Sequence, residues 1–379
     1  MLIVADSKIP FATEAFAPFG EVRVVPTTAM TRETIREADV LLIRSETNVS
    51  ESLLDGTHVR FVGTATIGFD HVDVEYLRRK QIAFASCPGS NANSVAEYVL
   101  AALLEWGERL SVRLREKTLG IVGHGNTGSR TAAKAEALGM NVLLNDPPLA
   151  RATGDPRYLP LDALMQADII SLHVPLTYEG VDATFHLFDE HRIAAMKAGA
   201  ILINTSRGAV VDSAALKRAL DAKHLSACVL DVWENEPAID AALLARTTFG
   251  TPHIAGYSYD GKLNATRMLV AALSKTFGIA ADPPSFLDEQ TKTPLVSAAQ
   301  SRDDEDVLRA AVRSAYDIRR DDERLRKILT LAAHQRAEYF RRLRAEYPLR
   351  REFHHYALAE AELGASTAMI ARKVGFSMR

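Results

Sequence analysis

Three residues in the middle of the chain have side chains suited to acid–base chemistry, and each follows a short apolar segment. They are Arg207 after residues 200–204, Glu236 after residues 227–231 and His253 after residues 248–251. Such segments predict buried strands of a parallel sheet, and residues beyond the carboxyl ends of parallel strands gather at one crevice. We therefore expect a guanidinium, a carboxylate and an imidazole to meet at one site.

Each of these side chains has a clear task if a hydroxyl group is oxidised there. Arg207 can hold a carboxylate or an oxygen with forked hydrogen bonds, and His253 can take the hydroxyl proton while a hydride leaves the adjacent carbon. Glu236 can orient the imidazole and raise its basicity, as the carboxylate does in a Ser-His-Asp triad. Taken singly, the three could equally be a surface charge, a loop residue and a core histidine. Their occurrence after successive strands favours the catalytic interpretation.

A glycine-rich segment upstream has the pattern that binds dinucleotides. Residues 123–128 read GHGNTG, directly after the apolar segment 119–122 and at the start of a predicted helix. The first glycine permits a tight turn, the second lets backbone amides approach a pyrophosphate, and the third lets helix and strand pack closely. The predicted cofactor-binding residues of this segment are Gly123, Gly125, Asn126, Thr127 and Gly128.

Asp146 follows the next predicted strand, residues 141–145. A carboxylate at this place accepts hydrogen bonds from the ribose hydroxyls of adenosine and repels a 2′-phosphate, so it favours NAD over NADP. Pro147 and Pro148 come next and restrict the backbone of the loop, but they leave this charge argument unchanged.

Short β-branched segments alternate with helical segments over most of the chain, which predicts parallel sheets. The strands expected in the N-terminal part are 2–5, 22–25, 40–43, 61–64 and 82–85, and those in the middle part are 119–122, 141–145, 168–172, 200–204, 227–231 and 248–251. The expected helices are 91–106, 127–138, 161–166, 190–197, 213–223 and 262–277. The predicted fold class is α/β, with two doubly wound parallel-sheet (Rossmann-like) lobes.

The remaining sequence patterns indicate where helices and domains begin and end. Ser94 and Glu97 match a capping box, which predicts that the first long helix begins beside them. The Asp-Pro-Pro sequence at 282–284 indicates a linker. Beyond it, 303–318 and 321–347 have helical patterns rich in arginine, and 350–379 is mixed, which predicts an added C-terminal α+β module.

Composition narrows the classes of function. The 379 residues are 25% charged and 47% hydrophobic with a net charge of −3, as in an ordinary globular protein of two or three domains. No segment has the length of a membrane span, and no basic stripe predicts a nucleic-acid partner.

Cys87 and Cys228 lie outside any metal-binding pattern, so we expect reduced cysteines, no metal and a cytoplasmic location. Residues 301–379 carry 17 Lys and Arg against 13 Asp and Glu, which fits a solvated face or a contact with an anion.

The middle of the chain resembles the NAD-dependent D-isomer-specific 2-hydroxyacid dehydrogenases. The matching strings are GHGNTG, LHVPLT (172–177), INTSRGAVVD (203–212), LDVWENEP (230–237) and TPHIAG (251–256). The resemblance implies that NAD is the cofactor and that Arg207, Glu236 and His253 form the catalytic trio. It also implies cofactor contacts from His173, Pro175, Thr177, Asp231 and Gly256.

The same resemblance implies a cofactor domain inserted into a substrate-binding lobe. We expect a substrate-binding lobe of residues 1–92 and 257–281, an NAD-binding domain of residues 93–256 and a C-terminal dimerisation domain of residues 285–379.

Strings near both ends narrow the resemblance to one branch of that family. They include RSETNVS (44–50), FVGTATIGFDHVD (61–73) and YPLRREF (347–353). This branch oxidises a phosphorylated four-carbon 2-hydroxy acid in the biosynthesis of pyridoxal 5′-phosphate, and its members are homodimers. The resemblance implies substrate contacts from Ser45 and Thr66, and we expect the phenol of Tyr257 to be a further hydrogen-bond donor to the substrate.

The phosphate of such a substrate needs positive charge. Arg44 is adjacent to Ser45, and Arg350 and Arg351 belong to the basic C-terminal part. We expect Arg44 and one of the other two, supplied by the dimer partner, to bind the phosphate. Arg350 and Arg351 could instead serve the dimer interface or face solvent.

Two other functions remain compatible with the sequence. One is oxidation of a different 2-hydroxy acid, such as 3-phosphoglycerate or glycerate, by a related dehydrogenase. The other is an NAD-sensing binding protein without turnover, because a fold does not by itself imply catalysis. The complete trio favours an enzyme.

Overall fold

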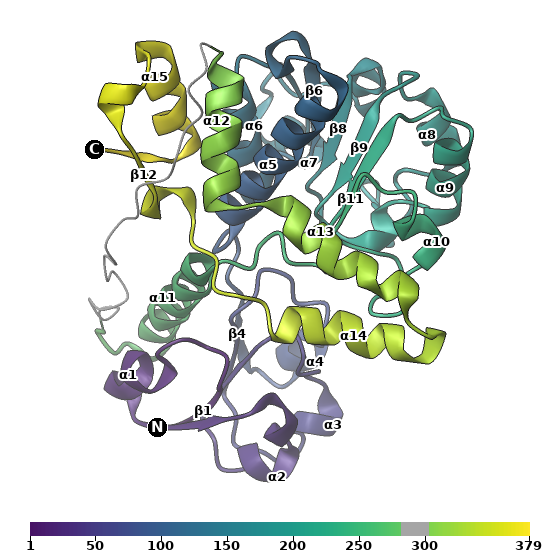
Figure 1. The fold of residues 1–379 in the computed structure, drawn as a ribbon. Helices are drawn as coiled ribbons and strands as arrows, with labels where there is room; N and C mark the ends of the chain where they lie inside the picture. Colours follow the sequence, from purple (N-terminus) through teal and green to yellow (C-terminus); the bar gives the residue numbers. More distant parts are fainter. Residues whose placement is uncertain (282–302) are drawn as a thin grey trace. The chain divides into compact units, whose positions relative to one another are not determined.

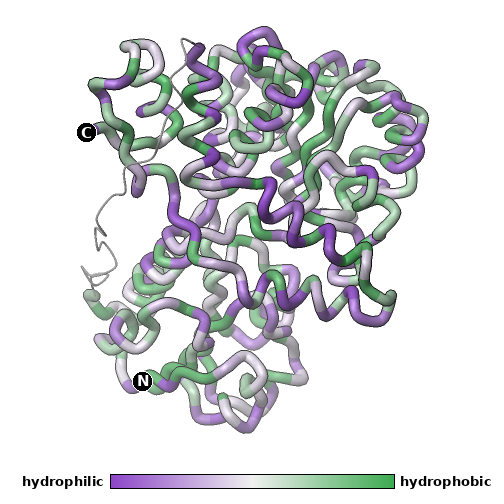
Figure 2. The backbone as a smooth tube through the Cα atoms, viewed as in Figure 1, coloured by the Kyte–Doolittle hydropathy of each residue, from purple (hydrophilic) through white to green (hydrophobic). Residues whose placement is uncertain are grey.

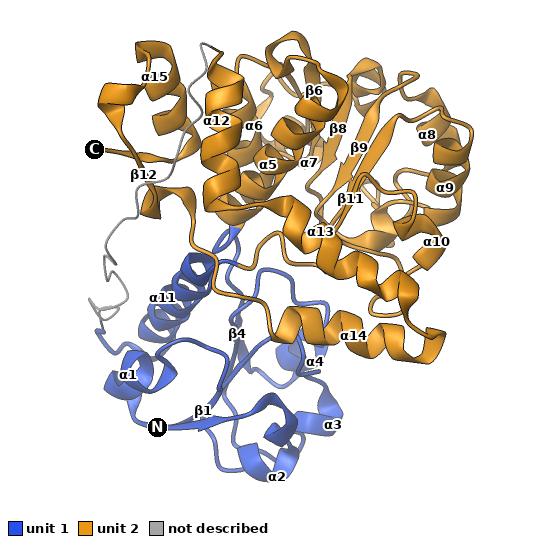
Figure 3. Cartoon of the chain, viewed as in Figure 1, with its two compact units in different colours: residues 1–91, 258–291 blue, residues 92–257, 292–379 orange. Residues whose placement is uncertain are grey.

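The computed structural model describes residues 1–281 and 303–379. The linker predicted at 282–284, and the residues 285–302 with which the C-terminal domain was expected to begin, lie outside the described residues. Among the described residues, 1–91 and 258–281 form one compact unit, unit 1, and 92–257 and 303–379 form a second, unit 2 (Figures 1 and 3).

Unit 1 contains a parallel sheet of five strands in the order β2-β1-β3-β4-β5. Its strands are β1 (Leu2–Asp6), β2 (Glu21–Val25), β3 (Val40–Ile43), β4 (Phe61–Thr64) and β5 (Ala83–Ala85). Its α-helices are α1 (Ala12–Phe16), α2 (Arg32–Ile35), α3 (Glu51–Leu54), α4 (Val74–Arg79) and α11 (Tyr259–Phe277), with 3₁₀ helices at Ala17–Phe19 and Thr27–Ala29.

Both faces of this sheet are buried. Ile3 and Leu42 belong to a core that includes Leu269 of α11, whereas Val4 and Leu41 belong to a second core on the opposite face. Neighbouring residues of a strand point to opposite faces, so β1 and β3 must be apolar at nearly every position.

Unit 2 contains a parallel sheet of six strands in the order β11-β10-β9-β8-β6-β7. Its strands are β6 (Thr118–Val122), β7 (Asn141–Asn145), β8 (Ile169–Leu172), β9 (Ile201–Asn204), β10 (Ala227–Leu230) and β11 (Phe249–Gly250). Its helices up to residue 257 are α5 (Ala92–Leu110), α6 (Asn126–Ala137), α7 (Pro147–Thr153), α8 (Glu190–Ala195), α9 (Ser213–Asp221) and α10 (Ala241–Leu244), with 3₁₀ helices at Leu114–Glu116, Leu161–Gln166 and Gly208–Val210.

The chain reverses its direction across this sheet at β6 and β8, which are neighbours although β7 lies between them in sequence. In open parallel sheets, ligands bind beyond the carboxyl ends of the strands at such a switch point. The predicted fold class, with two doubly wound parallel sheets, is confirmed.

The C-terminal part of unit 2 adds helices and a small parallel sheet. Its elements are α12 (Asp304–Ala315), α13 (Ile318–Arg326), α14 (Ala333–Ala345), α15 (Ala365–Val374), β12 (Ala357–Leu358) and β13 (Ser377–Met378), with 3₁₀ helices at Lys327–Thr330, Phe353–His355 and Glu360–Glu362. Figure 2 shows that the chain of α13 and α14 is largely hydrophilic, in contrast to the strands of the large sheet.

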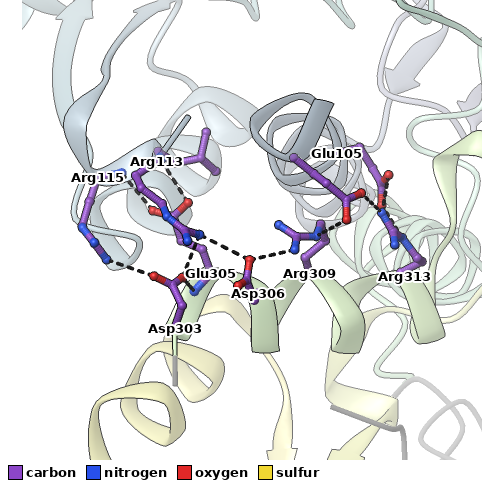
Figure 4. A network of polar contacts seen from close by, with 10 residues as sticks. Glu105, Arg113, Arg115, Asp303, Glu305, Asp306, Arg309 and Arg313 are labelled. Atoms are coloured by element: carbon purple, nitrogen blue, oxygen red, sulfur yellow. Dashed lines mark hydrogen bonds and ion pairs between the residues drawn. The ribbon is translucent and has the colours of Figure 1, made fainter. Parts of the chain in front are cut away.

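Ion pairs and hydrogen bonds fix α12 to α5 and to the turn that follows α5 (Figure 4). The guanidinium of Arg313 binds both oxygens of the buried Glu105 at 2.7 Å. At the other end of α12, Glu305 accepts the backbone N–H groups of Leu114 and Arg115 at 3.0 and 3.2 Å. The C-terminal part is therefore bonded to the same helix that covers the large sheet.

The C-terminal part also covers the edge strand β11. Asp322 of α13 accepts the N–H of Gly250 at 2.7 Å, and Arg326 donates to the carbonyl of Thr247 at 2.7 Å. These contacts occupy backbone groups that an edge strand would otherwise expose to other chains.

Two local predictions were wrong. The helix predicted at 321–347 is interrupted, because the backbone is extended at Leu331 and Ala332 between α13 and α14. The turn brings Leu325 and Phe340 into one buried core, which a straight helix would separate. The capping box is also wrong: α5 begins at Ala92, so Ser94 and Glu97 lie inside the helix, where both are buried.

Among the described residues, no helix has both the length and the apolar character that a membrane span requires.

Candidate active site

The loops that follow the strands of unit 2 carry the predicted site residues. The residues after each strand are Gly123 after β6, Asp146 after β7, His173 after β8, Arg207 after β9, Asp231 and Glu236 after β10, and His253 after β11. All six strands are parallel, so these loops leave the same edge of the sheet.

The glycine loop has the geometry that a dinucleotide needs. Gly123 has a φ of +88°, and a Cβ there would lie 2.7 Å from the carbonyl oxygen of His173. A Cβ on Gly128 would lie 1.9 Å from the carbonyl oxygen of Gly123, so only glycine lets α6 begin this close to the strand. A Cβ on Gly125 would meet nothing within 4 Å, which leaves open space above the helix start for a phosphate.

Asn126 and Thr127 are the first two residues of α6, so their N–H groups belong to the turn whose donors are free of partners within the helix. Such donors, together with the positive end of the helix dipole, attract a pyrophosphate.

Asp146 is held beside the glycine loop by two backbone hydrogen bonds. One carboxylate oxygen accepts the N–H of His124 at 2.8 Å, and the other accepts the N–H of Leu149 at 3.0 Å and so caps α7. Pro147 is the first residue of α7, where a helix tolerates the missing N–H. The residues of this edge of the sheet therefore fit the phosphates and the adenosine ribose of NAD.

The loop after β8 supplies a neutral histidine. Burial lowers the pKa of His173 to about 3, and its Nε2 lies 2.9 Å from the hydroxyl of Ser171. Its Nδ1 is buried and has no hydrogen-bond partner among the described residues. Further along this loop, the hydroxyl of Thr184 donates to the carbonyl of Pro175, and it accepts the N–H of Thr177 at 2.8 Å.

Glu236 and His253 form a hydrogen-bonded pair. One oxygen of Glu236 accepts the N–H of Trp233 at 2.7 Å, and the other lies 2.8 Å from Nδ1 of His253. Burial raises the pKa of Glu236, but the charge and hydrogen bond of His253 and the Trp233 N–H outweigh it, so the pKa is lowered overall. With Nδ1 bonded to the carboxylate, Nε2 is the nitrogen of His253 that can exchange a proton with a ligand.

Arg207 lies in the loop next to this pair. Asn204 shapes the loop by accepting the N–H of Ser206 at 3.0 Å and donating to the carbonyl of Arg207 at 2.9 Å. A Cβ on Gly208 would lie 2.0 Å from the backbone of Trp233, so the loops after β9 and β10 are in direct contact. The loops of the predicted trio therefore lie side by side within unit 2.

The backbone that directly follows His253 is held in place from two sides. His253 has a φ of +57°, in the left-handed region. The buried carboxylate of Asp231 accepts the N–H groups of Ile254 and Ala255 at 2.7 and 2.8 Å, and Arg350 donates to the carbonyl oxygens of the same two residues at 3.4 and 2.9 Å. Gly256 and its neighbour Ala255 form the turn that follows.

The structure gives Arg350 a different environment from that of a phosphate ligand. Its side chain is buried, donates to three backbone carbonyls including that of Ser94 at 2.6 Å, and lies 4.2 Å from the ring of Tyr316. This environment favours the structural alternative for Arg350. Arg351 is half-buried and contacts the ring of His355.

The other predicted substrate residues are placed as follows. In unit 1, Ser45 and Thr66 follow the neighbouring strands β3 and β4; Ser45 is exposed, and the hydroxyl of Thr66 donates to the carbonyl of Gly68 at 2.8 Å. Arg44 precedes Ser45 and is half-buried. In unit 2, the ring of Tyr257 meets that of Tyr347 edge-on at 6.0 Å.

Sequence reasoning missed Arg344, whose guanidinium carbon lies 5.4 Å from the ring centre of Tyr257. Its positive charge contributes to the low pKa of Glu236. Arg344 is one of several arginines on α14, and only the packing of that helix within unit 2 distinguishes it from the others.

Two family models match the chain. The NAD-binding domain of the D-isomer specific 2-hydroxyacid dehydrogenases matches residues 94–255, and a domain of unknown function (DUF3410) matches residues 286–374.

Relatives over nearly the whole length are erythronate-4-phosphate dehydrogenases. That of Salinibacter ruber is 47% identical and covers 94% of this chain and 93% of its own length. That of Yersinia enterocolitica is 42% identical and covers 100% and 99%.

Solved structures share the fold of a shorter part of the chain. D-lactate dehydrogenase from Aquifex aeolicus, in complex with NAD and lactic acid, is 28% identical with a TM-score of 0.60, over 73% of this chain and 96% of its own. NAD-bound 3-phosphoglycerate dehydrogenase from Entamoeba histolytica is 26% identical with a TM-score of 0.62, over 73% and 95%.

Proposed function

The chain belongs to the erythronate-4-phosphate dehydrogenases, within the D-isomer-specific 2-hydroxyacid dehydrogenase family, and from this premise we propose that it oxidises 4-phospho-D-erythronate at C2. The product is 3-hydroxy-2-oxo-4-phosphooxybutanoate, an intermediate in the biosynthesis of pyridoxal 5′-phosphate. The resemblance seen in the sequence is confirmed: the chain is an NAD-dependent dehydrogenase. Within the site, the proposal rests on the hydrogen bond between Glu236 and Nδ1 of His253. This bond leaves Nε2 of the imidazole to exchange a proton with the substrate.

The residues of unit 2 account for the movement of the proton. NAD, when bound, accepts the hydride that leaves C2. Nε2 of His253 takes the proton of the C2 hydroxyl, and Glu236, kept ionised by its low pKa, stabilises the resulting imidazolium. We propose that Arg207 holds the 2-oxygen and the carboxylate of the substrate with its forked donors. The charge of Arg207 then favours the alkoxide character that develops as the proton leaves.

We propose the NAD contacts that the sequence predicts, and the position of these residues in the loops after the strands supports the proposal. The set consists of Gly123, Gly125, Asn126, Thr127, Gly128, Asp146, His173, Pro175, Thr177, Asp231 and Gly256. Asp231 contributes through the backbone, because its carboxylate accepts the N–H groups that follow His253.

For the substrate, we propose that unit 1 contributes Ser45 and Thr66 as hydroxyl donors to the carboxylate, and that Arg44 faces the phosphate. Tyr257 is proposed as a further donor in unit 2. Arg351 remains a predicted contact of either the phosphate or the dimer interface.

We propose that the domain division is the one expected from the sequence and that residues 285–379 mediate homodimerisation. Leu349 and Met369 of this region expose 71% and 50% of their surface, and an interface would cover such side chains. Light scattering of the unmutated protein and of Leu349→Asp tests this: a dimer that dissociates in the variant is expected, and an unmutated monomer would contradict it.

We also propose a cytoplasmic location, because NAD and phosphorylated acids are charged metabolites that do not cross membranes unaided.

The experiment that tests the function is NAD reduction by the purified protein with three acids side by side: 4-phospho-D-erythronate, 3-phosphoglycerate and D-erythronate. The keto product is trapped so that an unfavourable equilibrium does not hide turnover. We expect the highest kcat/KM for 4-phospho-D-erythronate. Preference for 3-phosphoglycerate would contradict the named substrate, and NAD binding without turnover of any acid would indicate a sensor.

A further inference from the structure

Arg344 is a half-buried arginine that has no polar partner among the described residues. Its Nε is shielded from solvent and makes no hydrogen bond, and its guanidinium forms no hydrogen bond or ion pair with the described residues. Its one close neighbour of note is the ring of Tyr257, 5.4 Å from the guanidinium carbon. A shielded donor without an acceptor is unfavourable, because it has lost its hydrogen bonds to water without replacing them.

The other half-buried or buried arginines of the C-terminal part differ in this respect. Arg313 is paired with Glu105, Arg326 with Asp322 and two carbonyls, and Arg350 with three carbonyls. Each of these binds groups of its own chain. Arg344 is therefore the member of this set whose terminal N–H groups are not bound by the described residues, so they can bind a ligand.

The position of Arg344 relates it to the catalytic pair. Tyr257, over whose ring it lies, follows directly on the clamped turn after His253. Its charge also reaches Glu236, although both oxygens of Glu236 are already bonded to Trp233 and His253. The guanidinium thus adds positive charge that Glu236 senses, without forming an ion pair with that glutamate.

The proposed substrate has an anion of the right kind at the right separation. Four covalent bonds connect C2 of 4-phospho-D-erythronate to its phosphorus atom, so a phosphate must lie close to the groups that react at C2. Arg207 is assigned to the carboxylate end. A phosphate dianion binds a guanidinium through two parallel charge-assisted hydrogen bonds, and the ring of Tyr257 restricts the orientation of that guanidinium.

We propose that Arg344 binds the phosphate of the substrate and is a specificity-determining residue for the phosphorylated acid. This inference rests on the proposed function. It assigns to α14 a positive charge of the kind that the sequence suggested for Arg350 or Arg351. The structure uses Arg350 to hold the backbone after His253.

The test compares Arg344→Gln with the unmutated enzyme, using Arg342→Gln as the matched control. Arg342 lies on the same helix and also stacks on a tyrosine, at 5.2 Å from the ring of Tyr339, but it is exposed. For 4-phospho-D-erythronate, we expect KM to rise about 30-fold in Arg344→Gln with kcat changed less than about threefold, as for loss of a charged hydrogen-bond pair. Arg342→Gln should match the unmutated enzyme.

Two further measurements separate phosphate binding from an indirect effect. The kcat/KM for D-erythronate, which lacks the phosphate, should change less than about threefold in Arg344→Gln. Competitive inhibition by inorganic phosphate should weaken in that variant, and Arg344→Lys should restore part of it, because lysine keeps the charge without the fork.

The outcomes are distinct. Equal losses for both acids, or unchanged phosphate inhibition in Arg344→Gln, would overturn the inference while leaving the proposed function intact. Failure of the unmutated enzyme to oxidise 4-phospho-D-erythronate would overturn the proposed function and this inference together.

Discussion

The two large sheets of this molecule have the same construction but carry different chemistry at their ends. Both are parallel, and both have apolar cores on each face. In unit 1, β3 and β4 are followed by the hydroxyl residues Ser45 and Thr66, and the carboxylate of Asp6 at the end of β1 is occupied by Thr27 and the N–H of Lys8. In unit 2, the strand ends carry the glycine loop and the acid–base residues.

This difference shows that a parallel sheet fixes where the residues after its strands lie, whereas the types of those residues decide what they do. In unit 2, backbone hydrogen bonds hold the loops that carry the site residues. The N–H of Trp233 donates to the carboxylate of Glu236, and the carboxylate of Asp231 accepts an N–H from the turn after His253. In unit 1, the polar groups after the strands bond to one another and to the loop backbone: Thr27 donates to Asp6, and Thr66 donates to the carbonyl of Gly68. We therefore expect changes at the acid–base residues of unit 2 to affect kcat and changes at the hydroxyl residues of unit 1 to affect KM.

The largest effect is expected for His253→Asn. Asparagine tolerates the left-handed backbone of this position but cannot accept the hydroxyl proton, so kcat should fall about 10³-fold. His186→Asn is the matched control, since His186 also has a positive φ and lies 2.8 Å from a glutamate, Glu234. NAD affinity, measured by fluorescence titration, should be the same in both variants. Equal loss of kcat in the two would contradict the role of His253.

Glu236→Gln should have the next largest effect. Its low pKa keeps the Glu236 carboxylate ionised at neutral pH, and glutamine removes the charge that stabilises the His253 imidazolium. We expect kcat to fall about 100-fold and the histidine-dependent limb of the pH–rate profile to move to lower pH. Glu234→Gln serves as the control. A profile that stays in place would show that Glu236 does not act on the histidine.

A moderate effect is expected in unit 1. Ser45→Ala and Thr66→Val each remove one hydroxyl donor, so KM for the acid should rise about tenfold with kcat changed less than about threefold. Ser50→Ala, in the same loop region of unit 1, should leave both constants unchanged. A large fall in kcat with unchanged KM would show that unit 1 also takes part in the chemical step, which would remove the contrast between the two sheets.

The smallest effect concerns stability, and it has opposite signs in the two units. Burial raises the pKa of Glu97 in unit 2 to about 8, although the charge of Lys134 opposes this. The unfolded chain loses this proton near pH 4.5 and the folded chain near pH 8, so the contribution of Glu97 to stability falls as pH rises through that window. Urea unfolding should show Glu97→Gln gaining stability relative to the unmutated protein between pH 5 and 8.

Asp39 of unit 1 provides the opposite case. The N–H of Leu2 and the guanidinium of Arg60 hold its pKa below 3.8. Its contribution is present above the unfolded value and is lost as pH falls through the lower folded value. Asp39→Asn should therefore be destabilising near neutral pH and much less so in acid. Parallel pH dependences of the two variants would contradict this assignment.

Much of the fold could be predicted because its signals are local. The strands of both sheets are short apolar segments that stand alone between turns, and every predicted strand is present in the described residues. The glycine spacing from Gly123 to Gly128 is likewise a local requirement, since each glycine prevents a specific backbone clash.

The C-terminal part was harder to predict because long-range contacts decide it. Glu97 looked like a capping residue, but it accepts the N–H of Phe353, a bond across 256 positions. The residues from 321 to 347 have helical propensity throughout, yet the chain turns at Leu331 to bury Phe340 with Leu325. Local propensity does not report either interaction.

The local sequence was enough to predict where the strands lie along the chain and which residue types follow them, and a resemblance then supplied the family. Tertiary structure alone decided which nitrogen of His253 is bonded to Glu236 and which arginines of the C-terminal part are available. Arg350 and Arg344 lie six positions apart, and the sequence offers no reason to separate them. Arg350 is buried among carbonyls, whereas Arg344 lies over the ring of Tyr257 and has no polar partner in the part of the chain that the structure describes. The availability of a charged group depends on what packs around it.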